Sequence, residues 1–196
     1  MDLFLDYRDE EGGRLSDRQL RDALLNYLLA GRDTTAESLS WTSFRLIKNP
    51  TAVRKIRAEC NRHGFYGLEG EFNRAIDVDP TSTSSKELGY LEAKDLHYVR
   101  AVYHETLRLH PSVPRSSKVA LKDDFLPGGI FIEAGTTLIW SDWLMARNQE
   151  LWGSDAEEWK PERWLDKQGE IVPQSPWKFH SFNVSCSNPR EVCVIG

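Results

Sequence analysis

Cysteine is scarce in this chain of 196 residues, which contains three: Cys60, Cys186 and Cys193. So few cysteines, and an odd number of them, exclude a secreted scaffold built on disulfides and favour a reducing compartment. No apolar run approaches the roughly 18 residues that a membrane-spanning helix needs. Residues 1–15 also lack the basic and apolar regions of a signal peptide.

Positive charge is in short supply too. The net charge is -5 at pH 7, with 25 Lys and Arg against 30 Asp and Glu, so a nucleic-acid partner is not expected. Nucleotide-binding and hydrolase motifs are absent from the sequence. A zinc site on one helix face is excluded as well, because His104 and His110 are six positions apart where a zinc helix needs four.

The composition that remains suits a globular domain. Hydrophobic residues make up 40% of the chain and charged residues 28%, and 196 residues are enough to bury a sizeable core. The acidic, glycine-containing residues 1–15 indicate a linker that arrives from an upstream segment. We therefore expect the chain to be a piece of a longer protein.

The longest regular element is predicted over residues 16–49. Ser16 with Gln19 forms the pattern of a capping box, and Asn49-Pro50 supplies a stop. At 1.5 Å per residue, about 32 helical residues span about 48 Å, enough to cross a whole domain. Helical spacing predicts a buried side that consists of Leu20, Leu24, Tyr27, Leu28, Gly31, Leu39 and Leu46.

The centre of this helix, AGRDTT at 30–35, is poorly suited to a helix. Gly31 costs about 1 kcal/mol relative to alanine, and Asp33 and Thr34 offer the backbone competing hydrogen bonds. Two interpretations stay open. Either Gly31 marks a close helix crossing with polar residues facing solvent, or the helix opens locally and an acid and a hydroxyl face a pocket.

The rest of the chain divides into shorter elements. A helix is expected from Pro50 to Gly64, followed by a polar surface loop over 65–86. A second buried helix is predicted over 93–110, and short strand-like runs between glycine-rich turns predict a small sheet over 111–142. Glu105 and Arg108 share one side of the 93–110 helix. From the residues alone, an exposed ion pair worth a few tenths of a kcal/mol is the favoured interpretation.

Four separated motifs then stand in one order: AGRDTT at 30–35, ETLR at 105–108, PERW at 161–164 and a Phe-to-Cys loop at 182–193. Their order and spacing resemble the C-terminal half of the cytochrome P-450 superfamily, the haem-thiolate monooxygenases. The connecting text RLHPSVPRSSKVA and the hairpin LPGG-x-FIEAGT add to the resemblance, which covers nearly the whole chain. It implies a mainly α fold with a small β sheet and a long central helix.

On this resemblance, the long helix runs over the distal face of a haem. Ala30 and Gly31 would leave room for oxygen and substrate. Asp33 and Thr34 match the acid–alcohol pair of the family. Splitting O₂ needs two protons, which a hydroxyl can place by ordering a water and a carboxylate can relay from solvent.

The resemblance also implies a buried network of Glu105 and Arg108 with Arg163 of PERW, which would lock the last loops (161–196) behind the haem. Lys118 and Arg190 match positions that pair with the haem propionates. For Lys118, an exposed surface cation remains an alternative.

The iron ligand would be the thiolate of Cys193, which pushes electron density toward O–O cleavage. The surrounding loop departs from the family pattern F-x-x-G-x-R-x-C-x-G. Phe182 and Cys193 are eleven positions apart where the family has seven, and the glycine before Arg190 is missing. Cys186 is an alternative ligand, and a chain in which neither cysteine binds iron is another.

The function implied by the resemblance is insertion of one oxygen atom from O₂ into a C–H bond of a lipophilic small molecule. The text over 111–129 resembles fatty-acid and alkane ω-hydroxylases of fungi and plants. Heme b, NADPH-cytochrome P-450 reductase and the cytoplasmic face of the endoplasmic reticulum membrane are expected for the full-length family. The alternatives are a truncated, non-catalytic relic without stable haem and a plain helical binding module.

Overall fold

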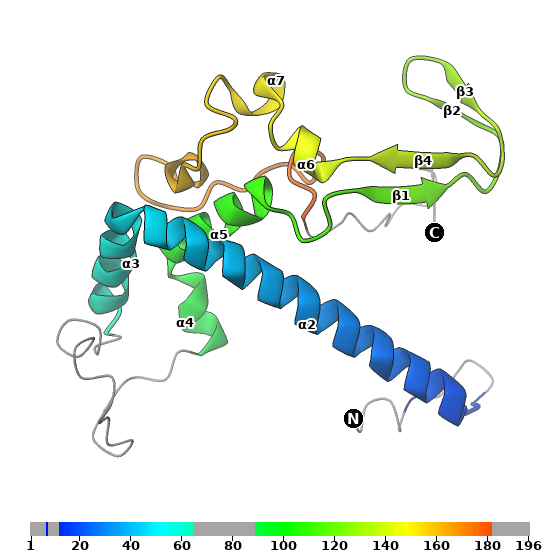
Figure 1. Ribbon diagram of the computed structural model, residues 1–196, viewed down its shortest axis with the longest axis horizontal. Helices are drawn as coiled ribbons and strands as arrows, with labels where there is room; N and C mark the ends of the chain where they lie inside the picture. The colour runs from blue at the N-terminus through cyan, green and yellow to red at the C-terminus, as the bar shows by residue number, and fades with distance from the viewer. Residues whose placement is uncertain (1–6, 8–11, 65–88, 182–196) are drawn as a thin grey trace.

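The computed structural model describes residue 7 and residues 12–64 and 89–181. It is mainly α with a small amount of antiparallel β structure, as predicted. Two helices come first, α2 (Asp17–Lys48) and α3 (Pro50–Arg62). The short α4 (Tyr90–Lys94) precedes the buried α5 (His97–Leu109). Figure 1 shows α2 as the longest element, running from the chain's N-terminal end into the body.

The predicted ends of α2 are confirmed. The Ser16 side chain accepts from the Gln19 amide at 3.3 Å, and the Gln19 side chain accepts from the Ser16 amide at 2.9 Å. These two bonds satisfy amides that have no partner inside a helix. At the other end, Asn49 leaves helical geometry at φ -129° and ψ 71° before Pro50 begins α3. The capping rules therefore located this helix to within a residue.

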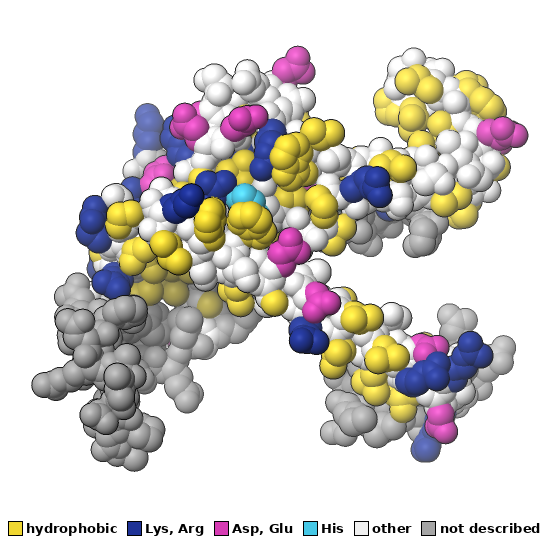
Figure 2. Space-filling view, in the orientation of Figure 1, with side chains coloured by type: hydrophobic (Ala, Val, Ile, Leu, Met, Phe, Trp, Pro, Cys, Tyr) yellow, Lys and Arg dark blue, Asp and Glu magenta, His cyan; other side chains and the backbone are white. Residues whose placement is uncertain are grey.

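The predicted buried side of α2 is wrong over the middle of the helix, where Tyr27, Leu28, Gly31 and Leu39 are exposed. Leu28 is 59% exposed, Leu39 is 53% exposed and Ser38 is the one buried residue among those described in the helix. The hydrogen bonds that join α2 to α5 and to the residue after it lie in the C-terminal half of α2, between Ser38 and Tyr103 and between Arg45 and His110. Periodicity identifies an apolar stripe, but packing partners decide whether the stripe is buried. Figure 2 shows apolar side chains at the surface of the N-terminal half of α2.

The helix predicted over 93–110 is divided in two. α4 ends at Lys94, and α5 begins at His97. The carboxylate of Glu59, in α3, accepts hydrogen bonds from the amides of Tyr98 at 2.8 Å and Val99 at 3.0 Å. Glu59 thus caps α5 from another helix, which places the boundary where no local sequence signal lies.

The core is built around α5. One buried cluster joins it to the C-terminal segments and consists of Ala101, Trp152, Ala156 and Trp164. A second joins it to α3 and consists of Ala52, Tyr98 and Val102. After α5 come the short α6 (Asp142–Met145) and α7 (Gln149–Trp152) and the 3-10 helix η1 (Pro161–Trp164), which packs against α5. None of the helices in the described ranges is both long and apolar enough to cross a bilayer.

The single small sheet expected over 111–142 is instead two separate pairs of antiparallel strands. β1 (Ser116–Val119) pairs with β4 (Thr137–Trp140), and β2 (Asp124–Leu126) pairs with β3 (Ile130–Ile132). Pro127 and Gly128 turn the inner hairpin, with Gly128 at φ 93°, a value that favours glycine. The inner hairpin projects away from the helices (Figure 1).

Candidate functional site

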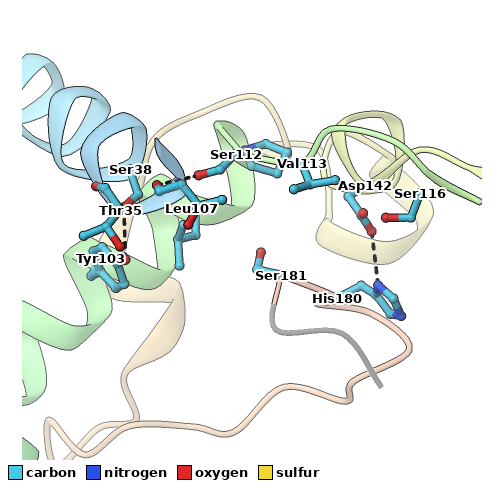
Figure 3. A pocket seen from close by; sticks show the side chains of 12 residues that line it. Thr35, Ser38, Tyr103, Leu107, Ser112, Val113, Ser116, Asp142, His180 and Ser181 are labelled. Carbon is cyan, nitrogen blue, oxygen red and sulfur yellow. Dashed lines mark hydrogen bonds and ion pairs between the residues drawn. The ribbon is translucent and has the colours of Figure 1, made fainter. Parts of the chain in front are cut away.

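A cavity of about 460 Å³ lies between the middle of α2 and the last described residues of the chain. α5, the segment after it, β1 and α6 complete the wall. Among the described residues, twelve line the cavity: Thr34, Thr35, Ser38, Tyr103, Leu107, Pro111, Ser112, Val113, Ser116, Asp142, His180 and Ser181. Figure 3 shows hydroxyl groups from α2 and α5 on one side and the Asp142–His180 pair on the other.

Thr34 lies in this wall, at the weak centre of α2. Its hydroxyl donates to the Ala30 carbonyl at 2.6 Å. The Ser112 hydroxyl, from the segment after α5, donates to the Thr34 carbonyl at 3.0 Å. The Thr34 hydroxyl hydrogen is therefore committed to its own helix, and the lone pairs of its oxygen remain for other partners.

The other predicted residues of this centre do not line the cavity. Asp33 lies 3.9 Å from Arg32, and the two side chains are 69% and 78% exposed. Ala30 and Gly31 are exposed, and α2 is continuous through them. A Cβ on Gly31 would meet no described atom within 4 Å, so the described residues form no close crossing there. Each interpretation of the sequence is correct only in part: Asp33 is exposed, and Thr34 lines the cavity.

Ser38 and Tyr103 join the site although the sequence analysis did not select them. Their hydroxyl oxygens are 3.1 Å apart, and Ser38 also donates to the Thr35 carbonyl at 2.9 Å. Ser38 has one hydroxyl hydrogen, so that second bond leaves Tyr103 as the donor of the pair. Ser38 follows Thr34 by four positions and therefore shares its helix face, a signal that was available in the sequence.

Glu105, Arg108 and Arg163 are brought together behind the cavity. The Glu105 side chain is fully buried and receives Arg108 Nε at 2.8 Å, Arg108 Nη2 at 2.9 Å and Arg163 Nε at 2.9 Å. It also accepts from the Lys160 amide at 2.8 Å and the Trp164 indole at 2.9 Å. A buried carboxylate with five donors is a fully paired charge, and the exposed ion pair is excluded.

The Arg108 guanidinium extends this network to the backbone of the C-terminal loops. It donates to the carbonyls of Ala146, Ala156 at 2.7 Å and Glu158 at 3.1 Å. Arg163 does the same for Asp155 at 2.9 Å. These carbonyls belong to loops with little regular structure, so the network fixes their course on α5.

At the far wall, the Asp142 side chain is 10% exposed and its Oδ1 lies 3.6 Å from His180 Nδ1. That distance is too long for a hydrogen bond, and Oδ1 has no other hydrogen-bond partner among the described residues. Burial raises the pKa of the Asp142 carboxyl, and His180 opposes that rise. The Trp140 ring meets His180 edge-on, with centroids 5.5 Å apart.

Of the remaining predicted residues, the structure describes only Lys118. Lys118 is half-buried in β1, two positions after the cavity-lining Ser116, and residues two apart in a strand share one face. Arg190, Cys193 and the alternative Cys186 lie outside the described residues. Cys60, the one cysteine that the structure describes, is a half-buried free thiol in α3, far from this site in sequence.

The cavity fits the haem that the sequence resemblance implies, a flat apolar ring system with two carboxylates. Its volume lies within the roughly 300–1,000 Å³ of pockets that hold small ligands. Leu107, Pro111 and Val113 supply apolar wall. Lys118, on the face of β1 that carries Ser116, would supply positive charge for a carboxylate. Asp142 runs against this charge pattern, although burial raises the pKa of its carboxyl and so favours the neutral form.

A sequence profile of the cytochrome P-450 family matches residues 1–183. Cytochrome P-450 monooxygenase cyp1 from Mycosarcoma maydis is 41% identical over 188 residues, which make up 93% of this chain and 27% of the relative. Cytochrome P-450 86B1 from Arabidopsis thaliana is 37% identical over 182 residues, 92% of this chain and 31% of the relative. Cytochrome P-450 52A10 from Candida maltosa is 39% identical over 183 residues, 89% of this chain and 31% of the relative.

The chain spans between about a quarter and a third of the length of these relatives. The family profile nevertheless covers most of the chain, and the matches to these relatives cover 89–93% of it. With the mainly α fold, the buried Glu–Arg–Arg network and the cavity beside Thr34, these matches lead to one assignment. The chain belongs to the cytochrome P-450 family.

Proposed function

We propose that this chain carries the oxygen-activating part of a haem-dependent monooxygenase that inserts one atom of O₂ into a C–H bond. One observation carries the proposal. Thr34, at the weak centre of α2, lines the same cavity as His180 and Ser181. These are the last described residues before the loop that contains Cys193. Thr34 on α2 and the segment that leads to the cysteine loop thus line the same cavity.

The residues that would hold the haem are Cys193, as thiolate ligand, and Lys118 and Arg190, as partners of its carboxylates. When bound, the haem supplies the oxygen-activating redox chemistry. The network of Glu105, Arg108 and Arg163 acts as structural support behind the cavity. Its fully paired charges hold the C-terminal loops in place and take no part in proton transfer.

The side chains of α2 would deliver protons into the cavity. Thr34 presents oxygen lone pairs there, which order a water molecule at the cavity wall. Asp33 is exposed and adjacent, so its carboxylate can collect protons from solvent and pass them along α2 toward Thr34. Ala30 and Gly31 contribute by leaving space one turn earlier on the helix.

The substrate class in this proposal is a lipophilic small molecule, with fatty-acid or alkane hydroxylation as the narrower form. The resemblance of residues 111–129 to ω-hydroxylases supports the narrower form. Electrons would come from NADPH through a cytochrome P-450 reductase. The setting would be the cytoplasmic face of the endoplasmic reticulum membrane, where the longer family members are expected to act.

A second candidate function rests on the cysteine loop. The family profile stops at residue 183, and Phe182 is followed by Cys193 at eleven positions instead of seven. A ligand loop works only when the sulfur sits at a fixed depth, within about 0.5 Å. These departures favour a relic of the family that folds in part and binds no stable haem.

Difference spectroscopy of the reduced, carbon monoxide-treated chain with added haem distinguishes the monooxygenase from the relic. A Soret band at the position typical of thiolate ligation supports the monooxygenase, and a chain that takes up no haem contradicts it. Cys193→Ala should abolish the band, while the matched variant Cys186→Ala should leave it intact. The reverse pattern would move the ligand to Cys186.

A further inference from the structure

Three backbone carbonyls around the cavity-facing turn of α2 accept a hydrogen bond from a hydroxyl. The Ala30 carbonyl receives Thr34 Oγ1 at 2.6 Å, and the Thr35 carbonyl receives Ser38 Oγ at 2.9 Å. The third, the carbonyl of Thr34 itself, receives Ser112 Oγ at 3.0 Å. Within a continuous helix these carbonyls also face the amide four residues later. The turn is therefore held by more hydrogen bonds than its helical ones.

The bond from Ser112 differs from the other two because it comes from another element. Ser112 follows the buried Pro111 in the segment between α5 and β1, and both residues line the cavity. Pro111 fixes its own φ, so the backbone that presents Ser112 is restrained. Ser112 thus ties the backbone of Thr34 to the cavity wall.

A second tie reaches the same turn from α5. The Tyr103 hydroxyl donates a hydrogen bond to Ser38, and the Ser38 hydroxyl donates one to the Thr35 carbonyl. The result is a directed chain from Tyr103 through Ser38 to the backbone next to Thr34. Figure 3 shows Ser112 and Tyr103 approaching α2 from two neighbouring segments.

We propose that Ser112 and Tyr103 are positioning residues that fix where the cavity-facing turn, residues 34–38, stands relative to α5. Neither hydroxyl needs to touch a ligand for this role. The consequence for chemistry rests on the proposed function, because it matters only if Thr34 handles protons. In that case, a misplacement of about 1 Å can cost about a hundredfold in rate.

Amide hydrogen exchange of the 196-residue chain tests the proposal without any haem. Ser112→Ala removes the tie to Thr34, and Tyr103→Phe removes only a hydroxyl while keeping the ring. Each should raise exchange of the amides at 35–39 by about fivefold, the factor for one ordinary hydrogen bond. Amides at 44–48, beyond the turn, should change little. Ser112→Thr, which keeps the hydroxyl, should restore protection.

The matched control is Ser40→Ala. Ser40 donates to the Ala36 carbonyl at 2.7 Å within α2 and reaches no other element through that bond. If Ser40→Ala raises exchange as much as Ser112→Ala, or if neither Ser112→Ala nor Tyr103→Phe raises it, the positioning role is wrong. The exchange readout is independent of the iron ligand. A chain without thiolate-ligated haem would overturn the proposed function and leave this inference standing.

Discussion

At the scale of the residue, Glu105 is the group on which most other groups depend. Its carboxylate is fully buried and pairs with two guanidinium groups, an indole and a backbone amide. A buried pair need not stabilise a protein by itself, but breaking one leaves the partners charged and unpaired. Arg108 and Arg163 would then keep their positive charge in a site with no anion of comparable burial.

We therefore expect Glu105→Gln to lower the free energy of unfolding by about 3–5 kcal/mol. Urea denaturation followed by far-UV circular dichroism measures this loss. Glu162→Gln is the control, because Glu162 pairs with Lys55 at 2.6 Å with a side chain that is 43% exposed. Glu162 also accepts from the Tyr98 hydroxyl at 3.0 Å, and glutamine keeps an oxygen for that bond. An exposed pair contributes at most about 1 kcal/mol. Equal losses in the two variants would mean that burial of Glu105 adds nothing.

Individual residues also show how much of the site could be predicted from the sequence. The motifs selected Glu105, Arg108 and Arg163, which the structure brings within hydrogen-bond distance. They also selected Asp33 beside Thr34, and only Thr34 lines the cavity. Neighbours in a helix point about 100° apart, and no local pattern states how far the helix is rotated about its axis. Orientation within a correctly predicted helix was therefore out of reach.

At the scale of the element, α2 shows that local residues determine where a helix begins and ends, whereas distant residues determine which side of it is buried. Its capping box and its stop are local, and both could be read from neighbouring residues. Its packing is not local, because the residues that touch it through hydrogen bonds, Tyr103, His110 and Ser112, lie more than sixty positions away. The start of α5 was missed for the same reason, since its cap, Glu59, is 39 positions from Tyr98.

Gly31 in the middle of α2 leads to a prediction about the helix as a unit. The position is exposed, helical and open, so a methyl group fits there. Gly31→Ala should raise the free energy of unfolding by up to about 1 kcal/mol, because glycine is a poor helix former. Thermal and urea unfolding measure the change. The mirror variant Ala30→Gly should lower stability by a similar amount.

A loss of stability in Gly31→Ala would contradict this expectation and point to a contact with residues outside the described ranges. A gain in stability together with weaker haem uptake would have a different meaning. It would indicate that the glycine is kept for the space it leaves in front of the cavity, at the expense of the helix.

At the scale of the whole molecule, α5 is the hub on which the other elements assemble. α2, α3 and η1 all pack on it. A mainly α fold with little β structure could be predicted from helical periodicity and glycine-rich turns. The division of the strands into two pairs could not, because pairing and register depend on partners that short, weakly patterned strands do not specify.

Two histidines lie where these elements meet. His110, after the end of α5, stacks on Trp41 with ring centroids 4.0 Å apart and accepts a hydrogen from Arg45 at 3.0 Å. Burial lowers its pKa from 6.5 to about 4, and the positive charges of Arg45 and Arg147 add to the effect. Burial likewise lowers the pKa of His104, which packs against Trp164 on the η1 side.

Acid should therefore loosen the assembly of α2 on α5. A lowered pKa in the folded state means that the unfolded chain binds the proton first as pH falls. The contribution of His110 is thus complete above pH 6.5 and is lost between 6.5 and about 4, so stability falls in that window.

Urea unfolding at a series of pH values, compared between the natural chain and His110→Gln, isolates this contribution from that of the carboxylates. Glutamine keeps an acceptor for Arg45 but cannot be protonated, so its profile should fall less steeply. Parallel profiles would show that His110 changes its proton affinity little on folding, and the junction of α2 with α5 would then be insensitive to acid.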